Sequence, residues 1–260
     1  MADDVNKAKH AAYTILEMYE GLIHEAHRRD DSDRIAYGCW LTLTTLEQFH
    51  AALCLIENRM SSHAAGPIRS MLESLADLLN LAACEGYADQ MRYDSAKENV
   101  TLFDEFGKSE HLEKEMTDTL AEWDARDRPV RDELAQSGTI TKKLHLEKKL
   151  ERVELEGIYV AYRVFCGMVH PNLTSLKARH NGSDEASVYR VDAPPAMVLT
   201  LLRYGVDFLT RAINVLPAFS SITEEQMKNV TDQAVAIWYD ADPLSSAEAK
   251  AAGTEHGAAT

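Results

Sequence analysis

Arg163 and His170 stand seven residues apart in one apolar stretch, and this spacing could support phosphodiester chemistry. At roughly 100° per residue, seven steps of a helix return to within about 20° of the starting direction, so both side chains fall on one face. Arginine offers a permanently charged planar fork that suits phosphate. Histidine exchanges protons near neutral pH. Together they could hold a phosphodiester and move the protons that cleave it.

The same two residues also admit a structural interpretation. His170 precedes Pro171, which disfavours helical geometry at the histidine and predicts that the helix ends there. Cations collect at helix C-termini because the unpaired carbonyls carry partial negative charge. His170 would then be only a C-terminal cap, and Arg163 only a surface or ion-paired residue. Spacing alone leaves both interpretations open.

A second polar pair, Arg69 and Glu73, lies at i,i+4 near the start of another apolar helix. It is either an intrahelical ion pair or part of the lining of a polar pocket. Because the other faces of both helices are apolar, their polar side chains need partners where the helices meet. We therefore expect Arg69, Glu73, Tyr162, Arg163 and His170 to form one polar cleft.

Metal chemistry has weaker support in the sequence. Glu47 and His50 have the spacing of one half of a di-iron ligand set, but no second Glu-x-x-His occurs in a helical segment. Glu20, His24 and His27 are more typical of the solvated face of an amphipathic helix. No phosphate-binding glycine loop, dinucleotide fingerprint or nucleophile elbow is present. We predict no metal site and no cofactor.

Composition limits the class of protein. The chain of 260 residues has an apolar fraction of 45%, few Gly and Pro, and a formal charge of −15. This charge argues against broad nucleic-acid binding but leaves room for a local basic cleft. The four cysteines form no C-x-x-C pair, the N-terminus does not resemble a signal peptide, and no apolar run approaches the ~20 residues of a membrane span. We expect a cytoplasmic protein without membrane contact.

Helical periodicity runs through nearly the whole chain and predicts an all-α bundle of about six to seven helices. We expect one domain over residues 1–242 and a disordered, dispensable tail over 243–260, which lacks large apolar residues after Leu244. Loops are expected at 61–66 and 171–193, the latter with at most one short β element. The expected helices cover 6–29, 34–60, 67–81, 88–136 as a long helix or hairpin that Pro129 breaks or kinks, 143–169, about 195–216 and 222–239.

Two motifs together resemble a large family of helical bacterial proteins of unknown function. One is Pro67-Ile68-Arg69-Ser70-Met71-Leu72-Glu73, and the other is Tyr162-x-x-x-Cys166-x-x-x-His170-Pro171 followed by Leu173-Thr174-Ser175-Leu176. The family shows Arg-x-x-x-Glu early and Tyr-x-x-x-Ser-x-x-x-His-Pro late, and the resemblance covers roughly residues 10–215. It implies a binding role for Arg69, Glu73, Tyr162 and Cys166. Cys166 stands where serine is common.

The later motif is also similar to the signature of the HEPN superfamily, helical-bundle proteins that include metal-independent ribonucleases of toxin–antitoxin and antiviral systems. That signature is an arginine followed after four to six residues by a histidine. The resemblance implies that Arg163 holds the scissile phosphate, that His170 is the general acid and base, and that two copies build one cleft. Val164 departs from the polar residue that often follows the arginine.

Two functions follow from these observations. The first is a HEPN-like, metal-independent endoribonuclease of bacterial defence or stress response, acting on RNA in a local cleft as a homodimer, with a possible antitoxin or defence partner. The second is a non-catalytic helical bundle protein that binds a ligand or partner, in which the same residues form a structural polar network.

Overall fold

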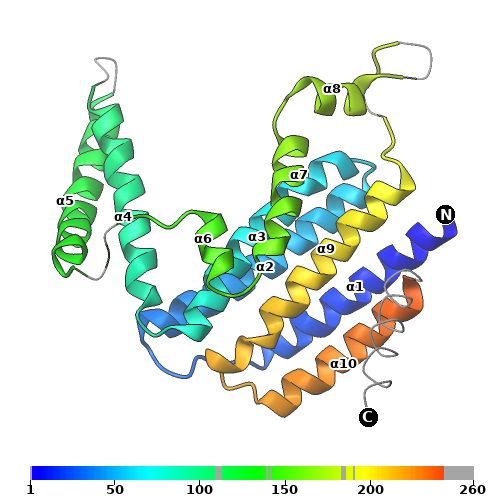
Figure 1. Cartoon of the computed structure of the whole chain (residues 1–260), viewed down its shortest axis with the longest axis horizontal. Coiled ribbons are helices and arrows are strands. Elements are labelled where there is room, and N and C mark those ends of the chain that lie inside the picture. Colours follow the sequence, from blue (N-terminus) through cyan, green and yellow to red (C-terminus); the bar gives the residue numbers. More distant parts are fainter. Residues whose placement is uncertain are drawn as a thin grey trace.

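The computed structural model describes residues 2–108, 113–138, 140, 142–182, 186–189 and 191–242. Within these ranges the chain forms ten α-helices and two short 3-10 helices, and its only β pairings are isolated bridges (Figure 1). The expected all-α class is confirmed. The helices are α1 (Ala2–His24), α2 (Asp33–Glu57), α3 (Ser61–Ala83), α4 (Tyr87–Phe106), α5 (Lys114–Gln136), α6 (Leu146–Glu151), η1 (Glu156–Ile158), α7 (Tyr159–Val169), α8 (Leu173–His180), α9 (Pro195–Asn214), η2 (Leu216–Ala218) and α10 (Glu224–Ala241).

The core lies among α1, α2, α3, α9 and α10, which run side by side in Figure 1. Apolar side chains at three- and four-residue spacing face inward, as an amphipathic helix requires. Fully buried examples are Phe49, Leu72, Leu75, Phe208 and Leu209. Burial of each such side chain stabilises the fold by ~1.5–3 kcal/mol.

Helix α2 is the most apolar of these core helices. By length and composition alone it is apolar enough to cross a membrane, contrary to the expectation that no such run occurs. The core helix of a protein that does not span a membrane can meet the same criteria, and α2 contributes Ile35, Leu46, Phe49 and Leu53 to the core. The helix begins at an N-cap, where Ser32 Oγ accepts a hydrogen bond from the backbone of Ile35.

The third helix begins earlier than predicted. We expected a loop over 61–66 and a helix start at Pro67, but α3 begins at Ser61 and continues through the proline. Ala64 and Ala65 are fully buried in the core, so packing favours helix over this segment. The cost is one lost backbone hydrogen bond, because Pro67 has no N–H to donate to the carbonyl four residues earlier.

The expected single helix over 143–169 is wrong, because this segment forms two α-helices, α6 and α7. Together with the α4–α5 hairpin and α8, this split raises the count to ten in the described residues, above the predicted six to seven. Helix α6 ends after Glu151, where Glu154 adopts a left-handed φ of 58° and Leu155 N donates to Leu150 O at 2.9 Å. This is a Schellman-type ending, which usually has glycine at the left-handed position. Because Glu154 occupies it here, the sequence carried no stop signal.

The region 88–136 forms a helical hairpin of α4 and α5, one of the two arrangements predicted. Pro129 does not break α5, which includes it as an interior residue. A further helix, α8, lies in the predicted loop 171–193 and begins at Leu173, directly after the N-cap Asn172, whose side chain accepts a hydrogen bond from Ser175 N. The expected β element is a single bridge between Asn181 and Ser187. The proposed tail, 243–260, lies outside the described residues.

The close packing of α2 against Phe219 requires a glycine at position 38. A Cβ added at Gly38 would overlap the buried ring of Phe219, whereas a Cβ at Gly21 would meet nothing within 4 Å. We expect Gly38→Ala to destabilise the protein by about 1–3 kcal/mol through overpacking. Gly21→Ala, on the exposed side of α1, should stabilise it by up to ~1 kcal/mol through helix propensity. Urea unfolding measures both, and equal effects would contradict the packing assignment.

Candidate functional site

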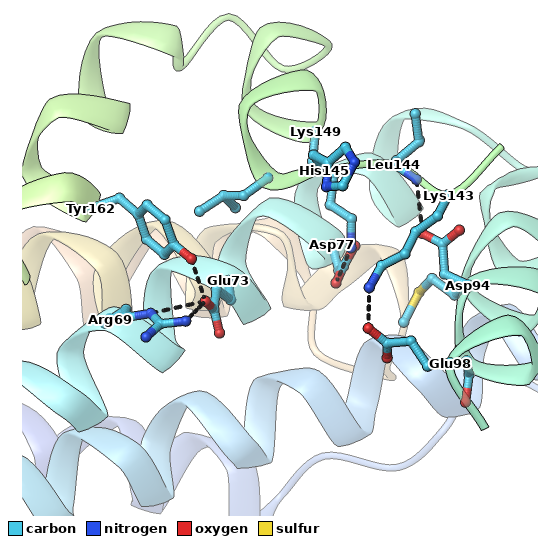
Figure 2. A pocket seen from close by; sticks show the side chains of 13 residues that line it. Arg69, Glu73, Asp77, Asp94, Glu98, Lys143, Leu144, His145, Lys149 and Tyr162 are labelled. Atoms are coloured by element: carbon cyan, nitrogen blue, oxygen red, sulfur yellow. Dashed lines mark hydrogen bonds and ion pairs between the residues drawn. The ribbon is translucent and has the colours of Figure 1, made fainter. Parts of the chain in front are cut away.

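Three side chains from two distant helices meet at one glutamate oxygen. Arg69 Nε and Nη2 donate to Glu73 Oε1 at 3.1 and 2.9 Å, and Tyr162 Oη donates to the same oxygen at 3.0 Å (Figure 2). The guanidinium carbon of Arg69 also lies 5.1 Å from the centroid of the Tyr162 ring, within cation–π range. Tyr162 on α7 is therefore joined to both polar residues of α3.

Burial raises the pKa of Tyr162 to about 12, with a further contribution from its hydrogen bond to the negatively charged Glu73. The thiol of Cys166, one turn later on α7, acts in the same direction. The phenol is thus a hydrogen-bond donor throughout the physiological range.

The centre of the site is an ion pair between α3 and α6. Lys149 Nζ lies 2.7 and 3.0 Å from the two oxygens of Asp77, and both side chains are less than one-fifth exposed. Tyr87, at the start of α4, donates to Asp77 Oδ1 at 2.6 Å. Burial and the adjacent Asp77 raise the pKa of Tyr87 well above its ordinary value. Asp77 therefore joins three separate parts of the chain.

The far end of the site joins α4 to the segment before α6. Asp94 accepts hydrogen bonds from Gln90 Nε2 at 2.7 Å and from the backbone of Leu144 at 3.3 Å. Burial raises the pKa of Asp94. Beside it, Lys143 forms an ion pair with Glu98 (Figure 2).

These groups surround a cleft of about 530 Å³ between α3, α4, α7 and the segment 143–149. Figure 2 shows polar side chains from all four elements around it. The lining residues are Arg69, Glu73, Asp77, Met91, Asp94, Ser95, Glu98, Lys143, Leu144, His145, Leu146, Lys149 and Tyr162. The volume lies within the usual range for small-molecule sites.

The structure divides the predicted site residues between two places. Arg69, Glu73 and Tyr162 line the cleft, with Cys166 half-buried beside Tyr162. Arg163 and His170 are exposed and do not line this cleft. In the described contacts, none joins His170 to Arg69 or Glu73.

The exposed positions of α7 recur at three- and four-residue spacing: Val160, Arg163, Val164, Gly167 and then His170 just after the helix. Arg163 and His170 therefore share the solvent side of α7. Tyr162 lies on the flank that faces α3.

His170 has a structural role as well as an exposed side chain. It is the C-cap of α7, with extended backbone dihedrals, and its carbonyl accepts from Ser175 Oγ at 2.6 Å and Asn172 N at 2.7 Å. Arg179 of α8 donates to Met168 O at the same helix end. The backbone of His170 thus fixes the connection from α7 to α8, while its imidazole stays available to solvent.

Several residues that line the cleft were not predicted from the sequence. Asp77 lies four residues after Glu73 and eight after Arg69, on the same helix face. Extending the i,i+4 pattern by one more step would therefore have identified it. Lys143, His145 and Lys149 belong to a basic stretch before the Arg163 helix, but nothing in one sequence indicates which distant carboxylates they contact. Asp94 and Glu98 lie in a segment that reads as a solvated acidic face.

No group of three or more His, Cys, Asp or Glu side chains within the described ranges could hold a metal ion. The cleft's chemistry is that of paired charges and hydrogen bonds.

The fold and the site define a helical bundle protein with a polar interhelical cleft. Residues 36–187 match the model of a family of unknown function, DUF5677, and the chain belongs to that family. The matched range includes the whole cleft and the exposed face of α7. No curated protein and no solved structure matches the chain.

The Tyr162–Glu73 hydrogen bond should contribute measurably to stability. We expect Tyr162→Phe to lower the free energy of unfolding by about 1 kcal/mol at pH 7. Because the folded pKa of about 12 exceeds the ordinary value of 10.0, this contribution is complete below pH 10 and is lost as pH rises toward 12. Urea unfolding at pH 7 to 11 measures the difference, with Tyr239→Phe on exposed α10 as control. A difference that grows with pH would contradict the assignment.

Proposed function

We propose that this protein binds a small polar ligand in the cleft between α3, α4, α7 and segment 143–149. The observation that carries the proposal is the convergence of charged side chains from three chain segments, with the Tyr162 hydroxyl from a fourth, around one open cavity of about 530 Å³. This is the non-catalytic, ligand-binding interpretation of the motif residues. Arg69, Glu73 and Tyr162 form one end of the site, and Asp94 and Glu98 the other.

The charges of the lining indicate the class of ligand. Three cations face four carboxylates, and all three cations pair with carboxylates within the cleft. A lining close to neutral repels a polyanion less than the rest of this acidic surface does, but gives it no net attraction. Alternating charges instead suit a zwitterion or an uncharged polar molecule, whose own donors and acceptors can be matched one by one.

The cleft keeps acceptors for such a ligand. All described hydrogen bonds of Glu73 end on Oε1, and the ion pair of Glu98 also uses Oε1. Their Oε2 atoms are thus the acceptors that a ligand amine or hydroxyl would use. Ser95 and His145, both exposed at the cleft, supply further hydrogen-bonding groups.

A thermal-shift screen with amino acids, nucleosides and polyols, and with nucleotides for comparison, tests this function. At about 100 times Kd, a ligand should stabilise the protein by ~2.7 kcal/mol, or roughly 5–10 °C in Tm. Glu73→Gln should raise the Kd for the ligand at least tenfold, whereas Glu47→Gln, on the exposed side of α2, should leave it unchanged. A screen without any shift, or equal binding by both variants, would contradict the proposal.

A second function, RNA cleavage of HEPN type, is favoured by a separate observation. Residues 157–182 contain no Asp or Glu but include Arg163, Lys177 and Arg179, on a chain of formal charge −15. The segment forms the exposed α7 and α8, so it offers phosphate a locally basic surface. The resemblance assigns phosphate binding to Arg163 and proton transfer to His170.

The spacing along α7 sets a condition on that chemistry. Seven residues correspond to about 10 Å along a helix axis, so the two side chains of one copy must reach toward each other to act on one phosphate. A second α7, antiparallel to the first, would place Arg163 of one copy beside the partner's His170 and so shorten that reach.

Incubation of purified protein with mixed RNA in excess EDTA tests this second function. Arg163→Ala and His170→Ala should each reduce cleavage by at least ~100-fold, the usual contribution of an acid–base group. Arg29→Ala and His50→Ala, exposed residues elsewhere, are matched controls. Equal residual cleavage by all variants would indicate a contaminating nuclease and would exclude this function. Circular dichroism of His170→Ala separates loss of chemistry from loss of the helix cap.

A further inference from the structure

Eight of the thirteen large apolar side chains that are exposed among the described residues lie on two projecting parts of the protein. One is the hairpin of α4 and α5, and the other is the pair α7 and α8, which stand on the same side of the bundle with α6 between them (Figure 1). The side chains concerned are between 38% and 69% exposed. They are Leu102, Phe106, Met116 and Trp123 on the hairpin, and Val160, Val164, Leu173 and Leu176 on α7 and α8. The other five are Trp40 and Leu43 on α2, Val188, Tyr189 and Tyr239.

The hairpin is poorly covered for its length. Among its described residues, α5 buries only Asp127, and its extensive packing is against α4 alone. Helices draw most of their stability from packing an apolar face rather than from propensity. Trp123 and Met116, about half exposed, extend the apolar surface that a partner could cover.

The two projections carry opposite charge. Helices α4 and α5 hold 12 carboxylates against 6 Lys and Arg, a formal charge of −6. Helices α7 and α8 hold three Lys and Arg and no carboxylate, a formal charge of +3. The hairpin and the α7–α8 face are therefore complementary in charge, and both are apolar in part.

We infer that two copies of this chain form a closed dimer in which the α4–α5 hairpin of each packs on the α7–α8 face of the other. Because the hairpin and the α7–α8 pair project from the same side of the bundle (Figure 1), one two-fold axis can bring each hairpin to the partner's α7 and α8. Such a contact is isologous and closes after two copies. It leaves neither projection exposed.

The alternative pairings bring like charges together. Two hairpins would oppose formal charges of −6, and two α7–α8 faces would oppose charges of +3. Like-charge contact disfavours these arrangements in the absence of a bridging ion or polyanion. In the proposed dimer the partner's hairpin would cover Arg163 and His170, so the hairpin and RNA would compete for the α7–α8 face. The inference itself is independent of the ligand cleft, since Trp123 and Val164 do not line it.

Sedimentation equilibrium tests the arrangement by comparing acidic with basic substitutions at the same position, since the two should change the dimer Kd by different amounts. Wild type should be a dimer at about 10 µM. Val164→Glu places a carboxylate against the acidic hairpin and should raise the dimer Kd at least tenfold more than Val164→Lys. Trp123→Lys should likewise raise the dimer Kd more than Trp123→Glu, because the α7–α8 face of the partner is basic. Thermal unfolding of each variant verifies that it is folded.

Tyr239 on α10, which is 41% exposed and outside both projections, is the matched control. Tyr239→Glu and Tyr239→Lys should leave the dimer unchanged, and Val164→Glu combined with Trp123→Lys should recover part of the lost affinity. A monomer at 100 µM would overturn the inference. So would a greater effect of Val164→Lys than of Val164→Glu, which would indicate that two α7 faces pair with each other.

Cross-linking of a mixture of ¹⁴N- and ¹⁵N-labelled protein gives a second readout. Lys114 at the start of α5 and Lys177 on α8 belong to the two surfaces proposed to touch. Lysine-reactive cross-links between them should join light to heavy chains. Cross-links found only within one chain would contradict the proposed dimer.

Discussion

The ion pair between Asp77 and Lys149 is the contact on which the arrangement of the cleft depends. It ties α6 to the central helix α3, and Tyr87 adds the start of α4 to the same carboxylate. Asn80 reinforces the junction by donating to Lys149 O at 2.9 Å. Because both charges are largely removed from water, loss of either partner would leave the other uncompensated, at a cost of up to ~3–5 kcal/mol.

Helix α7 serves two surfaces because its two sides meet different environments. Phe165 and Ala161 are buried against the bundle, and Tyr162 on the flank completes the Arg69–Glu73 cluster. The opposite side presents Arg163 and Val164 to solvent, and His170 follows at the cap. An amphipathic helix with polar groups on both flanks can thus contribute to the polar cleft on one side and to an exposed face on the other.

Much of the fold could be predicted from local rules. Helical periodicity located the core helices, and the expected starts at 34 and 195 lie within one residue of the observed starts of α2 and α9. The rules failed where packing overrode them, as at Pro67 inside α3, and where an unusual residue ended a helix. Arg59 and Glu154 both adopt left-handed dihedrals without being glycine. Such positions carry no local signal, because surrounding contacts rather than intrinsic preference stabilise them.

The sequence by itself determined the all-helical class, the i,i+4 spacing of Arg69 and Glu73 and the common helix face of Arg163 and His170. Each depends on the fixed geometry of one helix, which needs no tertiary information. Only the tertiary structure decided that Tyr162 joins Glu73, that Lys149 meets Asp77 and that Arg163 stays outside the cleft. These contacts span 72 to 89 residues, and the packing of whole helices, not local spacing, brings such residues together.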